Sequence, residues 1–228
     1  GHRLSKAMHL VEAAAAVGAD SVKFQWFGFE VTKNRMFCWI DGDEARAWRW
    51  YDSFLNPHHW AQVKQFADNL GIILLASTFE PETVQWLIDL NLAATKVASR
   101  AAKTFPYDME GLPRPFLIST GMDWELPPAK VLPPLPEAGF ILLDCESRYP
   151  STKAWDRSQS GFSDHSCKPV LAIDAISRGC KLLEVHFMID AIDAGPDLPA
   201  CLTLDELRLV CEARDFWANR SLARLGND

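Results

Sequence analysis

The 228-residue chain lacks several patterns that would place it in other classes of protein. It has no run of 18 apolar residues and no cleavable apolar leader, so we expect neither a membrane span nor secretion. Its six cysteines include no CxxC pair, which favours a reduced, soluble, cytoplasmic protein. Lys and Arg form no dense run and the net charge is −7, so nucleic acid is not an expected partner.

The chain has enough apolar residues for a substantial core, because 48% of its residues are hydrophobic. We therefore expect one domain over residues 1–228 rather than two small ones. Nine tryptophans are a high number, and Trp48, Trp50 and Trp60 lie close together in the sequence. This cluster is either part of the core or a binding surface.

Hydrophobic periodicity predicts a helix at the start of the chain and alternating strands and helices after it. Leu4, Met8, Val11 and Ala15 share one helical face, and Gly18 ends the helix. Further helices are expected over 57–70, 80–90, 168–178 and 204–217. Seven apolar runs are candidate strands, at 20–27, 72–77, 95–99, 115–119, 140–145, 161–165 and 182–187. This alternation is typical of a parallel sheet.

Each candidate strand ends in polar side chains. These are Lys23, Gln25, Ser77, Thr78, Lys96, Ser99, Ser119, Thr120, Asp144, Ser163, Asp164, His165, Glu184 and His186. In a (β/α)8 barrel the active site is built from the carboxyl ends of the strands, so the pattern favours an α/β TIM-type barrel. A doubly wound sheet is the rival fold, but it usually carries a Gly-rich first turn, and the chain has no GxGxxG.

Two connections are too irregular for normal barrel helices. The link between Ser119 and Phe140 carries five prolines within 127–136, and only 11 residues separate Tyr149 from Gly161. We therefore predict an incomplete barrel in which outer helices 5 and 6 are reduced or missing. Missing helices would leave apolar surface exposed, so we expect a homodimer or larger assembly.

Two histidines stand on adjacent predicted strand ends. His165 and His186 can both point into the mouth, where a pair of imidazoles can bind a divalent metal with water or substrate completing the shell. Asp164 and Glu184 are then candidates for orienting the rings or balancing charge. The alternative is that each histidine is a hydrogen-bonded structural residue.

Two lysines lie inside apolar strands, where an ammonium is costly without an anionic partner. Lys23 and Lys96, with the nearby hydroxyls, make a pocket suited to a phosphate or carboxylate. Alternatively, each lysine pairs with a buried acid. Tyr149-Pro150 either walls the substrate pocket or only redirects the chain, and Gly195 to Asp197 is a tight loop at the mouth or a plain turn.

Eight motifs in order resemble the N-acetylneuraminate (sialic acid) synthase family, also called NeuB-like. They are GADSVKFQ, STFEPETVQWL, TKVAS, LISTGM, CESRYP, GFSDH, LLEVHF and GPD, and they cover the chain from residue 4 to about 212. The resemblance implies a C–C bond-forming transferase that condenses phosphoenolpyruvate with an N-acetylmannosamine-like aldose. The products are a nine-carbon 2-keto sugar acid and phosphate.

The resemblance also implies roles for individual residues. A divalent metal, Mn²⁺ or alternatively Mg²⁺, is held by His165 and His186. Glu184, Tyr149 and Asp197 lie around the sugar and the attacking water. The residues implied to hold phosphoenolpyruvate are Lys23, Gln25, Thr78, Lys96, Ser99, Ser119 and Ser163.

The chain also departs from the family pattern. The family's first strand, with a catalytic glutamate and an NHNG-like turn, has no counterpart, and neither does its C-terminal antifreeze-like domain. Asp144 and Leu198 stand where the family tends to have His, and STFE replaces STPFD. Three hypotheses follow: a synthase, a catalytically impaired binding or structural descendant that keeps the phosphate and metal site, and a related barrel acting on another aldose phosphate.

Overall fold

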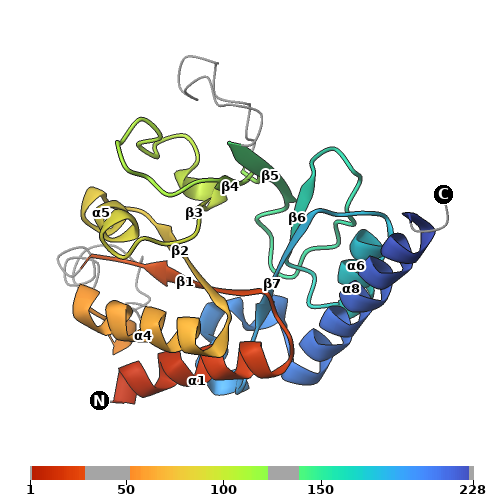
Figure 1. The fold of residues 1–228 in the computed structure, drawn as a ribbon, viewed down its shortest axis with the longest axis horizontal. Helices are drawn as coiled ribbons and strands as arrows, with labels where there is room; N and C mark the ends of the chain where they lie inside the picture. The colour runs from red at the N-terminus through yellow and green to blue at the C-terminus, as the bar shows by residue number, and fades with distance from the viewer. Residues whose placement is uncertain (1, 29–51, 123–138, 226–228) are drawn as a thin grey trace.

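The computed structural model describes residues 2–28, 52–122 and 139–225 (Figure 1). Two features predicted from the sequence lie outside these ranges. They are Trp48 and Trp50 of the tryptophan cluster and the proline-rich stretch 127–136.

The structure is built on one sheet of eight parallel strands in sequence order. The strands are β1 (Ser21–Trp26), β2 (Ile73–Thr78), β3 (Thr95–Val97), β4 (Phe116–Ser119), β5 (Phe140–Cys145), β6 (Gly161–Asp164), β7 (Leu182–Phe187) and β8 (Cys201–Leu202). The first seven confirm the predicted strands. β8 was not predicted, because two residues are too short to show a period; it pairs with the end of β7.

The sheet curls without closing on itself. In the described part of the chain β1 pairs with β2 alone, and the strand order ends at β8. The two ends of the sheet are therefore not joined by backbone hydrogen bonds, and the prediction of an incomplete (β/α)8 barrel is confirmed.

Helices cover the outer face of the sheet in two groups (Figure 1). The first group follows the early strands and comprises α1 (His2–Ala16), α4 (Pro57–Leu70) and α5 (Pro81–Asp89). The second comprises α6 (Pro169–Ser177) and α8 (Leu204–Leu225), while α7 (Ala191–Ala194) and the 3₁₀ helix η2 (Gly195–Ala200) link β7 to β8. None of the helices in the described ranges has the length and apolar character needed to cross a membrane.

Local capping explains where α4 begins and ends. The Asn56 side chain accepts a hydrogen bond from the amide of His59, and Pro57 occupies the first turn, where it costs no hydrogen bond. Gly71 ends the helix in the left-handed conformation, with φ of 72°. The predicted start at Pro57 and stop at Gly71 are both confirmed.

Two described connections contain no α-helix. Residues 146–160 form an irregular link, which confirms the prediction for the outer helix after β5. Residues 98–115 contain only the short 3₁₀ helix η1 (Ser99–Ala101) and turns, which the sequence analysis did not predict. There the rings of Phe105 and Tyr107 pack on Phe116 of β4, with centroid distances of 6.4 and 5.6 Å, and take the place of a covering helix.

The main core lies between the sheet and the first group of helices. Trp26 of β1 is 1% exposed and packs against Trp60 of α4 and Trp86 of α5. Trp60 is therefore a core residue. The barrel interior is a smaller cluster that includes Leu75, Leu117 and Leu143, and it forms a floor below the polar strand ends.

Side chains of the turn after α1 and of α8 close the seam between the two ends of the sheet. Val17 packs with Leu207 and Cys211 in one buried cluster. Beside it, Arg214 of α8 donates hydrogen bonds to the Asp20 carboxylate at 2.6 Å and to the Gly18 carbonyl at 3.0 Å. This guanidinium joins the end of the chain to the turn that enters β1.

We predict that Arg214→Ala lowers the free energy of unfolding by about 1–2 kcal/mol, because two charge-assisted contacts across the seam are lost. Urea denaturation monitored by tryptophan fluorescence measures the effect. Arg208→Ala is the matched control, since among the described residues Arg208 forms a local ion pair with Asp205 on the exposed face of the same helix. Equal losses of unfolding free energy in the two variants would show that the Arg214 contacts across the seam stabilise the fold no more than a local surface ion pair does.

Candidate active site

The inner face of the sheet is set by strand alternation. On β1, Val22 and Trp26 belong to the outer core, so Lys23 and Gln25 face inward. Gln25 lies in register with Ser77 of β2, and Ser77 lies in register with Lys96 of β3. These positions form one polar row across neighbouring strands, above the apolar floor.

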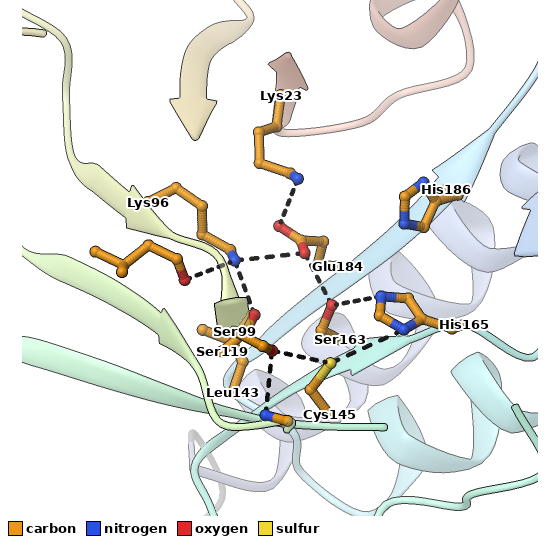
Figure 2. A network of polar contacts seen from close by, with 12 residues as sticks. Lys23, Lys96, Ser99, Ser119, Leu143, Cys145, Ser163, His165, Glu184 and His186 are labelled. Carbon is orange, nitrogen blue, oxygen red and sulfur yellow. Dashed lines mark hydrogen bonds and ion pairs between the residues drawn. The ribbon is translucent and has the colours of Figure 1, made fainter. Parts of the chain in front are cut away.

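The carboxylate of Glu184 on β7 is the centre of the polar mouth (Figure 2). Its Oε2 lies 3.7 Å from Lys23 Nζ, and its Oε1 lies 3.5 Å from Lys96 Nζ. Ser163 of β6 donates a hydrogen bond to Oε1 at 2.8 Å, and Lys96 donates to the Ser119 hydroxyl of β4 at 2.8 Å. Five strand ends are thus brought together, and the two lysines share one acid.

Charge and burial set the protonation of this cluster. Burial alone would raise the pKa of Glu184, but Lys23 and Lys96 hold it well below its usual range, so the carboxylate is ionised. Burial lowers the pKa of Lys96, which is 2% exposed, although Glu184 opposes the shift. When both lysines are protonated, two cations face one anion, and the net positive charge favours an anionic ligand.

The two predicted metal-binding histidines lie beside this cluster, with ring centroids 5.2 Å apart. His165 Nδ1 lies 2.7 Å from the Glu146 carbonyl, which can only accept, so Nδ1 carries a proton, and Nε2 has a free lone pair when the ring is neutral. Burial, with Lys23, lowers the pKa of His186 to about 3, so that ring is neutral near pH 7. Its Nδ1 lies 3.7 Å from the Asp197 carboxylate.

These two rings fit a metal site that has only two protein ligands. Each has an acceptor near Nδ1, as metal-binding histidines usually do, and this leaves Nε2 for the metal. Within the described ranges no group of three or more His, Cys, Asp and Glu side chains is arranged to hold an ion. Water or substrate would have to complete the shell.

Tyr149 covers the histidine pair. Its ring stacks on His165 with a centroid distance of 4.5 Å and meets His186 edge-on at 5.5 Å. Its hydroxyl lies 3.5 Å from His186 Nε2, and burial, with the nearby Asp197 charge, raises the pKa of that hydroxyl. Of the two hypotheses for Tyr149-Pro150, these contacts favour a wall of the site.

Three other predicted binding residues lie at the edges of the cluster. Gln25 is exposed and lies two residues beyond Lys23 on the same face of β1. Ser99 donates a hydrogen bond to Cys145 rather than to a lysine partner. Thr78 is fully buried at the register position of Trp26, on the face that carries the outer core, and its hydroxyl has no hydrogen-bond partner in the described part of the chain.

At the end of β5, Cys145 faces the mouth and Asp144 does not, contrary to the sequence prediction. Asp144 is in register with Phe162, which packs outward, and its carboxylate pairs with Lys153 of the link after β5. Cys145 is in register with Ser163 and contacts both Ser99 and His165. Alternation from the buried Leu143 identifies Cys145, two residues further on, as the inward-facing residue.

Asp164 also lies away from the two rings that it was expected to orient. It is in register with Val185, which packs against the outer helices, and its carboxylate accepts a hydrogen bond from the Ser166 amide at 2.8 Å. Asp197 is the carboxylate beside the His186 ring.

We predict that Glu184→Gln lowers the free energy of unfolding by about 3 kcal/mol at pH 7, because Lys23 and Lys96 lose their shared counter-charge in a buried site. Urea denaturation is the measurement. Glu212→Gln, which removes an exposed acid of α8, is the control and is expected to change stability by less than about 0.5 kcal/mol. If Glu184→Gln lost no more unfolding free energy than the control, Lys23 and Lys96 would not depend on Glu184 as their counter-charge.

Comparison with known proteins agrees with the fold and with the sequence motifs. Pseudaminic acid synthase of Campylobacter jejuni is 27% identical over 234 residues, which is 92% of this chain and 68% of that protein. Human N-acetylneuraminate-9-phosphate synthase is 27% identical over 228 residues, or 90% of this chain and 63% of that protein. The chain thus spans about two thirds of the length of these relatives.

Solved structures agree with the fold, and the family profile gives the family. The sialic acid synthetase of Leptospira borgpetersenii superposes with a TM-score of 0.73 at 19% identity, covering 94% of this chain and 78% of the other. The spore coat polysaccharide biosynthesis protein SpsE of Bacillus subtilis gives 0.69 at 23% identity, covering 96% and 65%. At these identities the likeness shows the fold. The NeuB family profile matches residues 10–221, and the chain therefore belongs to the NeuB family.

Proposed function

We propose that this chain catalyses the condensation of phosphoenolpyruvate with an N-acylated amino sugar of the N-acetylmannosamine type, assisted by Mn²⁺. The reaction joins C3 of phosphoenolpyruvate to the aldehyde carbon, adds water at C2 and releases inorganic phosphate, so no oxidant or reductant is needed. The supporting observation is the Lys23–Glu184–Lys96 cluster beside the His165–His186 pair. The activities named for the relatives are of this sialic-acid type.

Phosphoenolpyruvate is assigned to the lysine side of the mouth. Lys23 and Lys96 supply positive charge, and Ser119 is held against Lys96. The hydroxyl of Ser77, which faces the mouth, is fully buried and makes no hydrogen bond in the described part of the chain, which normally means that a ligand or water satisfies it. Thr78 lies on the opposite face of β2, so its place in the proposed set rests on the family resemblance alone. Ser99, Ser163 and Gln25 complete the proposed set.

The acceptor sugar is assigned to the histidine side. A divalent metal held by His165 and His186 would polarise the sugar aldehyde as a Lewis acid. Tyr149 walls this side and limits access of water to the rings. Asp197 keeps the His186 ring oriented, and Glu184 holds Ser163 in place while it balances the lysine charges.

A second candidate is a descendant that binds substrate without turnover. The observation that favours it is the unjoined seam between β1 and the β7–β8 end of the sheet, which lies directly beside the proposed site. A binding protein of this kind keeps the anion pocket and the histidine pair, so affinity alone does not separate it from an enzyme.

We predict that inorganic phosphate is released from phosphoenolpyruvate only when Mn²⁺ and an N-acylmannosamine are both present. His165→Ala or His186→Ala is expected to reduce Mn²⁺ affinity by more than about 100-fold. Loss of a group that is hydrogen-bonded to a metal ligand already costs about 10- to 100-fold, and loss of the ligand itself costs more. A coupled phosphate assay and Mn²⁺ titration by electron paramagnetic resonance measure these effects. His9→Ala, at an exposed position of α1, is the control.

The assay also decides between the candidates. Phosphoenolpyruvate binding by calorimetry with no product from any N-acyl sugar would support the binding descendant. Product from an aldose phosphate alone would support a related barrel activity instead. Unchanged Mn²⁺ affinity in both histidine variants would disprove the metal site.

A further inference from the structure

Cys145 lies between the two halves of the proposed site (Figure 2). Its sulfur is 3.6 Å from the Ser99 hydroxyl, which donates to it, and 3.9 Å from Nδ1 of His165. The side chain is 7% exposed, and it ends β5 on the face that carries the mouth. One thiol therefore contacts a residue of the anion pocket and a residue of the histidine pair.

The hydrogen-bond directions at this thiol are set by its neighbours. His165 Nδ1 carries a proton, because the Glu146 carbonyl at 2.7 Å can only accept. The sulfur therefore accepts from Nδ1 as a second, weaker acceptor and also accepts from Ser99.

The Ser99 hydroxyl is held on both sides. It accepts from the Gly121 amide at 3.1 Å and donates its single proton to the Cys145 sulfur. Gly121 is needed for this approach, since a Cβ there would lie 3.0 Å from Ser99 Oγ and 2.5 Å from Ser147 Oγ. A hydroxyl has one proton, so an oxyanion that takes the Ser99 proton must take it from the sulfur.

We propose that Cys145 is a positioning residue that holds the His165 ring and couples its orientation to occupancy of the anion pocket through Ser99. When an oxyanion accepts the Ser99 proton, the Cys145 sulfur keeps one donor, the N–H at Nδ1 of His165. The sulfur then accepts from this N–H alone, so the hydrogen bond strengthens and the ring is held more firmly. Nε2 is then fixed for the metal. The inference deepens the proposed function and rests on the anion pocket and histidine pair named there.

The test uses metal-free protein and inorganic phosphate, so it does not depend on turnover. The long-range proton–nitrogen NMR spectrum of the imidazole rings reports the His165 Nδ1 resonance, assigned with His165→Gln. We expect saturating phosphate to shift this resonance in the wild type and not in Cys145→Ala. Cys145→Ser, which keeps a hydrogen-bonding group, is expected to restore part of the shift.

Cys180→Ala is the matched control, because Cys180 is another free thiol and bonds the Leu182 carbonyl at the opposite end of the strands. It is expected to show the wild-type shift. An equal shift in Cys145→Ala would mean that the anion acts through its charge alone, which overturns the proposal. We also expect Cys145→Ala to weaken Mn²⁺ binding about tenfold, as removal of an outer partner does.

A ligand-free comparison separates this inference from the proposed function. Ser99→Ala is expected to shift the His165 Nδ1 resonance in the wild-type background and to have no further effect in Cys145→Ala. If calorimetry shows that phosphate does not bind, the anion pocket is wrong, yet this comparison still decides whether Ser99 and His165 are coupled. Equal effects of Ser99→Ala in both backgrounds would refute the coupling.

Discussion

The ion pairs of Glu184 with two lysines are the interaction on which the rest of the site depends. Lys23 lies on β1 and Glu184 on β7, so their contact crosses the gap that backbone hydrogen bonds leave open. Lys96 reaches the same carboxylate from β3. Three parts of the curled sheet are thereby fixed around one buried charge, and the histidine pair takes its place next to it. An isolated ammonium or carboxylate would be too costly at this depth, so the three groups must be present together.

Much of the fold could be predicted from the sequence, because apolar runs and helix stops are local signals. The seven longer strands, the Pro57 start and the Gly71 stop all follow from patterns within a few residues. The short β8 and the link of residues 98–115 could not be predicted in this way. β8 exists because two residues pair with the end of β7, and the link is ordered by aromatic packing on β4. Both depend on contacts between distant segments.

Most of the side chains that meet at the strand ends could also be predicted, whereas the contacts between them could not. The sequence left open whether the lysines bind an anion or pair with an acid, and the structure shows that both share Glu184. It pointed to Asp144 at the end of β5, where the strand period places Cys145 instead. The charged Asp144 faces outward, while the weakly polar thiol of Cys145 faces the mouth. The two-residue alternation of side chains along a strand identifies the residue that faces the mouth better than side-chain polarity does.

The open seam also has a consequence for the local stability of the barrel. From β1 to β8, separating neighbouring strands breaks a ladder of backbone hydrogen bonds, but across the seam the described residues make side-chain contacts only. We therefore expect local opening to need the least free energy at this edge, and amide hydrogen exchange to be fastest along the side of β1 that has no partner strand among the described residues. The same edge carries Lys23, so an anion held by the proposed lysine pocket would slow hydrogen exchange at this edge of the sheet.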